Sequence, residues 1–243
     1  MGYFKTCERE RLDILMMKKV ILGICAVTLV GSQGFAATDN AKLVDRLNAA
    51  SRVITEIEAT PDKSIPTSIL SNATCVAVVP GYKKAAFVAG VSYGQGVVTC
   101  KTSHGWSAPA FIQMAGGSFG FQIGGQATDL VLIAVNQRGM QDLLKSKFKI
   151  GGDAAASAGP VGRNAGAATN LTLKSELLTY SRSQGLFAGI DLNGTVVNQN
   201  TEDTRTYYGS DVPFATILEG NKVTPVSARP FVRTVAKYFR SAQ

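Results

Sequence analysis

The chain has 243 residues, 25 of them basic and 17 acidic, with 45% apolar residues and a formal charge of +8. At roughly 100–200 residues per domain, this length predicts one domain or two small ones. The apolar content excludes an intrinsically disordered chain. His104 is the only histidine, so metal sites that need several histidines are excluded. The excess of positive charge favours anionic partners.

Residues 1–36 are predicted to lie outside the folded domain. Two lysines precede an apolar run over 20–30, and Gly34 and Ala36 fit the small residues at the cleavage site of an export signal. The run is shorter than the about 20 residues that a membrane-spanning helix needs. We therefore expect an upstream extension and a cleaved signal peptide over 1–36, and an exported protein, periplasmic or secreted, that begins at Ala37.

Removal of residues 1–36 leaves 20 basic and 14 acidic residues and two of the four cysteines, Cys75 and Cys100. Both lie in strand-like runs that are candidates to be neighbours. Two such cysteines in an oxidising compartment are more often paired than free, so we predict a disulfide. Closing a loop of about 25 residues stabilises a fold by roughly 3 kcal/mol in the chain-entropy model.

A helix is expected over 41–58, because apolar residues recur there at steps of three and four. Its apolar stripe is formed by Leu43, Leu47, Ala50, Ile54 and Ile57. This stripe favours docking on the domain over insertion into a membrane.

Asp39 or Asn40 is a suitable N-cap for this helix. A short helical turn is expected to follow over 65–70.

From Thr74 the sequence changes to short β-branched and aromatic runs broken by glycine, which predicts strands. Between Ala85 and Thr128 the only formal charge is Lys101, which is typical of strands packed on both faces. The expected strands cover 75–81, 85–100, 107–116, 117–125, 128–136, 171–182 and 185–199, and further helices are expected at 137–147, 210–220 and 230–241. The sum is an α+β fold, with a mostly antiparallel β-sheet or partial barrel and amphipathic helices at the N- and C-terminal ends.

Catalytic motifs are not supported. Two G-x-S-x-G strings surround Ser92 and Ser118, but strand-like sequence follows both, and neither precedes an acid and then a histidine as a nucleophile elbow requires. No P-loop or dinucleotide fingerprint occurs, and the carboxylates are scattered. We predict a non-enzymatic protein without a metal site or cofactor.

Basic residues suggest a binding surface instead. Residues 229–241 place Arg229, Arg233, Lys237 and Arg240 in one helical stripe beside an apolar stripe. Such a helix either binds anionic lipid or docks on the sheet with its basic stripe in water, and the sequence leaves both open.

A second basic run includes Lys145 and Lys147 and precedes a Gly-rich loop that contains Arg163. Backbone amides in such a loop can cradle an anion, and the arginine supplies a phosphate-binding fork. Nucleic acid is not an expected partner, because of the export signal and because aromatic residues are not interleaved with basic ones before the tail.

Several longer stretches of the sequence resemble one known family. VAVVPGYKKAAFVAG, YGQGVV, GWSAPAF, GGSFGFQIGGQATDLVL, GGDAAASAGPVGRNA and YSRSQGLFAGIDLNG resemble the SYLF domain family, over about Leu43 to Val197. The resemblance implies a single lipid-binding domain over 37–243 and no catalytic activity. It also implies phospholipid as ligand, with phosphoinositides the ligands of eukaryotic members.

The resemblance also bears on individual residues. Lys83 and Lys84 in YKKAAF, and Arg163 in GPVGRNA, occupy basic positions of matched motifs and are candidate anion contacts. We expect an exported protein that associates peripherally with anionic, phosphoinositide-like headgroups of a phospholipid membrane. The alternative is an envelope scaffold or stress protein that acts through protein contacts. Some eukaryotic members bind actin, a role that the predicted export makes unexpected here.

Overall fold

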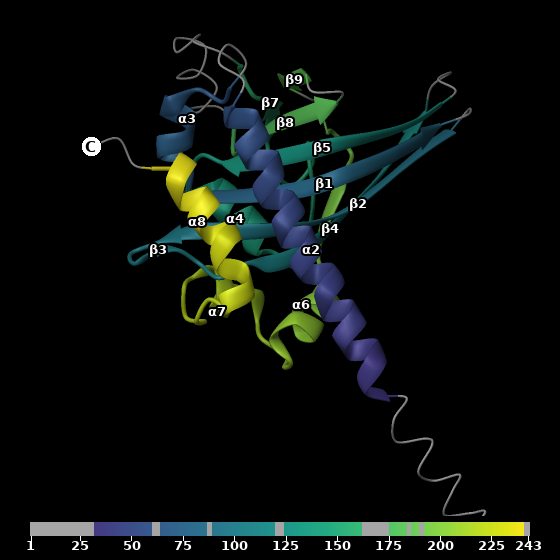
Figure 1. Cartoon of the computed structure of the whole chain (residues 1–243). Coiled ribbons are helices and arrows are strands. Elements are labelled where there is room, and N and C mark those ends of the chain that lie inside the picture. The colour runs from purple at the N-terminus through teal and green to yellow at the C-terminus, as the bar shows by residue number, and fades with distance from the viewer. Residues whose placement is uncertain are drawn as a thin grey trace, which may run out of the picture. The chain divides into compact units, whose positions relative to one another are not determined.

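The computed structural model describes residues 32–59, 64–86, 89–119, 124–161, 175–183, 186–189 and 192–240 (Figure 1). Two compact units are distinguished, Met1–Lys42 and Leu43–Gln243. The predicted signal segment up to residue 31 lies outside the described residues. In the first unit, Lys42 donates a 2.8 Å hydrogen bond to the Asp39 carboxylate on the exposed surface of a helix. The second unit holds the sheet and both hydrophobic cores.

Helix α2 spans Ser32–Glu58, so the expected N-cap at Asp39 or Asn40 is wrong. From Leu43 onward the predicted apolar stripe is confirmed, because all five of its residues are buried. The expected turn over 65–70 is helix α3, which Pro66 precedes. The remaining described helices are α3 Thr67–Asn72, α4 Gln137–Leu144, α6 Thr201–Tyr208, α7 Phe214–Leu218, the 3₁₀ helix η1 Val226–Ala228 and α8 Arg229–Tyr238.

The strands form a ten-stranded sheet in the order β6-β10-β4-β2-β1-β5-β8-β7, with β3 paired to β2 and β9 to β8. Among the described strands only β7 and β8 pair in parallel, which confirms the predicted, mostly antiparallel α+β fold. The strands are β1 Cys75–Ala86, β2 Ala89–Thr102, β3 Gly105–Trp106, β4 Ala110–Phe119, β5 Gly124–Ala134, β6 Lys147–Lys149, β7 Ala156–Ala158, β8 Leu177–Ser183, β9 Leu186–Gly189 and β10 Val196–Gln199.

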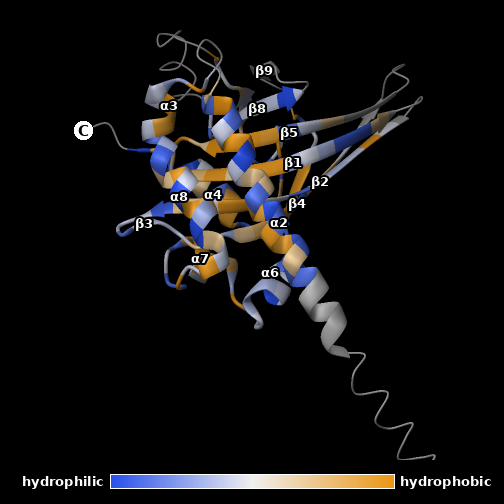
Figure 2. Cartoon of the chain, viewed as in Figure 1, coloured by the Kyte–Doolittle hydropathy of each residue, from blue (hydrophilic) through white to orange (hydrophobic). Residues whose placement is uncertain are grey.

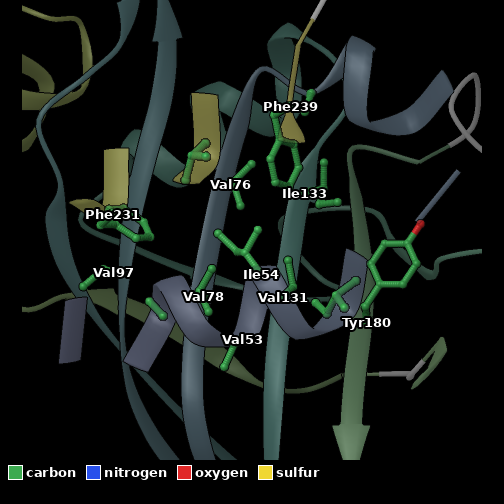
Figure 3. Close-up of a cluster of buried hydrophobic side chains, with 14 of the residues drawn as sticks. Val53, Ile54, Val76, Val78, Val97, Val131, Ile133, Tyr180, Phe231 and Phe239 are labelled. Carbon is green, nitrogen blue, oxygen red and sulfur yellow. The ribbon is translucent and has the colours of Figure 1, made fainter. Parts of the chain in front are cut away.

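The centre of the sheet is covered on both faces, as the lack of charge between Ala85 and Thr128 predicts. For the outer part of the same stretch the prediction is wrong, because Ala85, Val91, Tyr93, Ala115 and Ala127 are exposed. The first core lies between one face and helices α2, α3 and α8. Figure 3 shows Val76, Val78 and Val131 of this face beside Ile54 of α2 and Phe231 of α8. The second core lies on the opposite face, against α4 and α7. Figure 2 shows the apolar colour concentrated along these central strands.

A register shift in β1 reverses its two faces. The pairing with β2 is irregular between Val78 and Lys83, and the pairing with β5 is irregular between Val79 and Tyr82. Gly81 has φ of 62° in this bulge, a conformation that glycine adopts without steric cost. Val78 therefore packs in the first core, whereas Tyr82, four residues later, packs in the second.

The predicted disulfide is confirmed between Cys75 of β1 and Cys100 of β2. The two residues are directly opposite in the antiparallel register, with Cα atoms 3.9 Å apart. The next pair, Thr74 and Lys101, exchanges a backbone hydrogen bond of 2.7 Å, so the cysteines occupy the closer, non-hydrogen-bonded position.

Two predicted helices are shorter than expected. The helix over 137–147 ends at Leu144, and the helix over 210–220 is reduced to α7. Helix α6 was not predicted. It begins where the Asn200 side chain accepts a hydrogen bond from the backbone N–H of Asp203. Its residues are mostly polar, so an apolar period does not reveal it.

Candidate functional site

Helix α8 buries the apolar stripe that the sequence places beside its basic stripe. Val235 and Phe239 of the predicted stripe are buried in the first core, whereas its third member, Val232, is only partly buried against that core. The flanking Phe231 is buried as well, and the Phe239 ring meets Trp106 edge-on at 5.8 Å. Pro230 lies in the first helical turn, where its missing N–H has no helical partner to lose. Of the two interpretations that the sequence leaves open, the structure therefore selects docking on the sheet.

The basic stripe of α8 faces solvent. Arg229, Arg233, Lys237 and Arg240 are exposed, and we call these four residues the C-terminal basic surface. Within the described ranges, no carboxylate lies within 4.0 Å of their nitrogen atoms. The sequence contains no acidic residue after Glu219. These cations consequently keep their charge available to an external anion.

Two exposed valines lie directly before this surface. The side chain of Val223 is 84% exposed and that of Val226 is 73% exposed. Val226 begins η1, and η1 runs directly into α8. Val226 precedes Arg229 by three residues and Arg233 by seven, a spacing that places it on the same side of the helix as these arginines. Sequence reasoning missed both valines, because this segment has two prolines and no regular period. Apolar side chains beside unpaired cations are typical of a membrane-surface element.

The other predicted lysines are distributed differently. Lys145 is the C-cap of α4 and donates a 2.6 Å hydrogen bond to Asp142, a pairing that raises the pKa of the lysine above its usual value. Lys147 is exposed on the edge strand β6. Lys149 has the same orientation, with the buried Phe148 between them. The Lys145 charge is balanced by a partner, whereas the two β6 lysines are exposed.

Lys83 and Lys84 lie on β1, and their side chains point to opposite faces of the sheet. Lys83 is opposite Tyr93, and Lys84 is opposite Ser92. Strand β1 is four strands away from β6, a separation of about 19 Å at the usual strand spacing. The structure therefore does not gather the predicted lysines into one patch. Arg163 lies outside the described residues.

Among the described carboxyl groups, that of Glu58, at the end of α2, has the largest pKa shift. Burial raises the pKa of Glu58 to about 7, against a smaller opposite effect of the hydrogen bond to the Ile65 backbone. The buried Tyr180 hydroxyl has no hydrogen-bond partner among the described residues, and burial and the nearby Glu58 raise its pKa. The Glu58 Oε1 atom also has no hydrogen-bond partner among the described residues, so both groups cost stability under the end of α2. They are remote in sequence from the basic surface.

The geometry around Ser92 does not match that of a catalytic serine. The Tyr82 hydroxyl donates to Ser92 Oγ at 2.6 Å, and Ser92 Oγ donates to the Gly116 carbonyl at 3.2 Å. Ser92 lies within β2, between strand residues, as expected for a serine that is not in a nucleophile elbow. In the described part of the chain, no group of His, Cys, Asp or Glu side chains is arranged to hold a metal ion.

A family model described as "Ysc84: Las17-binding protein actin regulator" matches residues 115–238. The chain belongs to this SYLF (Ysc84) family. The match runs from β4 to α8 and includes the whole helical part of the C-terminal basic surface. The family description concerns binding and regulation and names no reaction.

Relatives of this SYLF protein include SH3 domain-containing YSC84-like protein 1 of Rattus norvegicus, which is 35% identical over 181 residues, 73% of this chain and 53% of the relative. The human protein of the same name is 34% identical over 181 residues, again 73% of this chain and 53% of the relative. Protein YSC84 of Saccharomyces cerevisiae is 34% identical over 176 residues, 71% of this chain and 37% of the relative. The chain thus matches about half, or less, of the length of these relatives.

The comparisons correct the predicted location. The prediction that the protein is exported to the periplasm or secreted is wrong. The relatives include SH3 domain-containing proteins of mammals and fungi, and the family is described as an actin regulator. The expectation that an actin role is absent rested on export and loses its support. In the described residues, no helix combines the length and apolar character needed to cross a membrane.

Proposed function

We propose that this SYLF protein binds anionic phospholipid headgroups peripherally through its C-terminal basic surface. The observation that carries the proposal is the exposed stripe of Arg229, Arg233, Lys237 and Arg240, which no described carboxylate neutralises. Each lysine or arginine near an anionic membrane contributes about 1 kcal/mol of attraction. Val223 and Val226 add exposed apolar side chains at one end of the stripe.

The chemistry of the ligand is that of a phosphate group presented at a membrane. Guanidinium groups bind phosphate oxygens in bidentate geometry, and two of the three stripe residues within α8 are arginines. The resemblance to the SYLF family adds phosphoinositides as candidate headgroups. Because anionic lipids and free phosphate share this chemistry, the test must separate them.

Co-sedimentation with phospholipid vesicles tests the proposal. Vesicles of phosphatidylcholine, of phosphatidylcholine with phosphatidylglycerol, and of phosphatidylcholine with a phosphoinositide at matched charge are compared across a salt series. We expect binding to both anionic vesicles that falls as salt rises. Binding indifferent to lipid charge and salt, or abolished equally well by low concentrations of inorganic phosphate, would overturn the proposal.

A triple variant locates the surface. Arg229→Gln, Arg233→Gln and Lys237→Gln together are expected to weaken binding to anionic vesicles about 100-fold, at about 1 kcal/mol for each charge. The matched control removes three other exposed charges, with Arg138→Gln, Lys149→Gln and Arg205→Gln. An equal loss in both variants would mean that net charge, rather than the α8 surface, determines binding.

A protein-binding role is the second candidate, and the family description favours it. The family is described as Las17-binding and actin-regulating, and several of its relatives carry SH3 domains by name. We infer that the domain supports protein contacts as well as lipid contacts. A pull-down of purified actin filaments and of a Las17-type partner, with and without vesicles, tests this role. Failure of both partners to bind would remove it and leave the lipid proposal untouched.

A further inference from the structure

Four strands of the sheet project beyond the helices that cover its centre. Figure 1 shows β1, β2, β4 and β5 running on past the part of α2 that belongs to the second unit. On the side of the first core, the projecting part presents mainly small and apolar side chains. We call this the projecting face; its residues are Lys83, Ala85, Val91, Tyr93, Ala115 and Ala127, all exposed.

The strand register places these residues on one surface. Tyr93 is opposite Lys83 on β1 and opposite Ala115 on β4, while Lys83 is also opposite Ala127 on β5. Val91 is opposite Ala85 in the next row outward. Directly paired residues of an antiparallel sheet point to the same face.

Polar contacts mark where helical cover ends. Arg46 of α2 donates to the Gln95 side chain at 2.8 Å, and Arg182 of β8 pairs with Asp129 at 2.9 Å and with Glu56 of α2. Beyond the row of Gln95, the side chains of Val91 and Tyr93 are 70% and 48% exposed. They belong to the same face of β2 as Val97, which is buried in the first core. The strand pattern continues outward, but the cover by the part of α2 that belongs to the second unit does not.

The opposite face of the projecting strands is polar. Lys84 is opposite Ser92, and Ser92 is hydrogen-bonded to Tyr82. Between Ala85 and Thr128 the sequence has no acidic residue. The projecting end is therefore amphipathic, and its only formal charges in the described strands, Lys83 and Lys84, are positive.

Charge argues against a second protein copy as the occupant of the projecting face. The formal charge among the described residues of this face is positive, at Lys83. Two copies that meet through this face would bring like charges together, which costs free energy. A membrane with anionic headgroups complements the lysine charge instead. Tyrosine is enriched at membrane–water interfaces, and lysine stems lie along apolar surface while the ammonium group reaches the phosphates.

We propose that the projecting face is a membrane-insertion surface, with Val91 and Tyr93 among the headgroups and upper acyl chains and with Lys83 at the phosphates. This inference rests on the proposed lipid-binding function. It adds a second surface that acts by apolar burial, whereas the C-terminal basic surface acts by charge. Salt separates the two contributions, because apolar burial is not screened.

Tryptophan fluorescence tests the inference. Tyr93→Trp retains a large ring at an exposed position, and Trp106 is the only other tryptophan, so the wild type supplies the background. On adding anionic vesicles we expect a blue shift of the new emission and quenching by brominated acyl chains. The matched control is Gln141→Trp, at an exposed position of α4 on the opposite side of the sheet, where no shift is expected.

The outcomes of the fluorescence test are distinguishable from failure of the proposed function. A wild-type protein that does not bind vesicles removes both proposals. A wild-type protein that binds while Tyr93→Trp stays unshifted removes the insertion surface alone.

Val91→Ser gives a second measurement. It is expected to weaken vesicle binding several-fold, with the loss retained at high salt, where the α8 triple variant no longer differs from wild type. Sedimentation velocity of the wild type and of the same variant tests whether a second copy of the chain covers this face instead. A dimer that Val91→Ser dissociates would overturn the inference in favour of a second copy.

Discussion

The covered centre and the projecting end of the sheet belong to the same four strands but have different environments. In β2, Val97 is buried between the sheet and helices α2 and α8, whereas Val91 on the same face is 70% exposed. The residue types along the strand change little between these positions. The difference teaches that a strand's apolar residues form a core only where another element covers them, and that an uncovered stretch is available for another partner.

The largest difference in stability between the covered centre and the projecting end is expected when a core side chain is truncated. Phe111→Ala removes a fully buried ring that meets Tyr207 at 5.2 Å, and we expect it to lower the free energy of unfolding by about 3–5 kcal/mol. Val91→Ala, on the projecting face, is expected to change it by less than about 0.5 kcal/mol. Urea unfolding measures both. Similar losses at the two positions would mean that the projecting end is covered in solution.

Removal of the disulfide is expected to cause the second-largest loss of stability. Cys75→Ala with Cys100→Ala should lower the free energy of unfolding by about 3 kcal/mol, because the bond closes a loop of 25 residues. Thermal unfolding of the double variant beside the oxidised wild type provides the measurement. The disulfide joins the covered ends of β1 and β2, so vesicle binding by the folded double variant should be unchanged; weaker binding would couple the two regions.

Two glycines offer a matched pair with a smaller effect. A Cβ at Gly96 would lie 2.4 Å from the Val78 carbonyl oxygen, whereas a Cβ at Gly117 would meet only the Gly90 carbonyl oxygen, at 3.9 Å. We expect Gly96→Ala to destabilise the fold by about 1–3 kcal/mol through overpacking. Gly117→Ala should stay within about 0.5 kcal/mol. Chemical denaturation distinguishes them, and equal values would contradict the close packing at the centre.

The smallest expected effect depends on pH. Burial raises the pKa of Glu58 to about 7 from 4.5, so the folded state binds more protons than the unfolded state between these values and stability falls as pH rises through them. Glu58→Gln should therefore stabilise the protein at pH 8, by about 1 kcal/mol after solvent screening, and not at pH 4.

Denaturation of Glu58→Gln at both pH values, beside the exposed control Asp45→Asn, measures the difference. A gain that is equal at the two pH values would show that ionisation of Glu58 is not its cause.

Much of the fold is predictable because its signals are local. The stripe from Leu43 to Ile57, the strand-like runs over 75–81, 85–100 and 128–136 and the turn at Pro66 are patterns within a few residues, and the structure confirms them. The strand expected over 117–125 is wrong, because β4 ends at Phe119 and β5 begins at Gly124. Helix α6 is the exception, because capping by Asn200 and contacts from Thr204 and Tyr207 to the sheet replace an apolar period.

The candidate site was less predictable. Lys145 carries the same charge as Lys147, yet Asp142, three residues before it, neutralises it. The exposure of Val223, Val226 and Val91 depends on whether a distant element covers them, and their own neighbours in sequence do not decide that. The predicted export likewise depended on a local signal, and the relatives contradict it.

The sequence by itself determined the α+β class, the membership suggested by the long SYLF strings, the pairing of Cys75 with Cys100 and the basic stripe of α8, because each depends on residue types at short or fixed spacings. Only the tertiary structure decided that the apolar stripe of α8 is buried and its basic stripe free, that the bulge at Gly81 reverses the faces of β1, and that four strands end without cover. These outcomes follow from contacts between residues far apart in the chain, which no local pattern specifies.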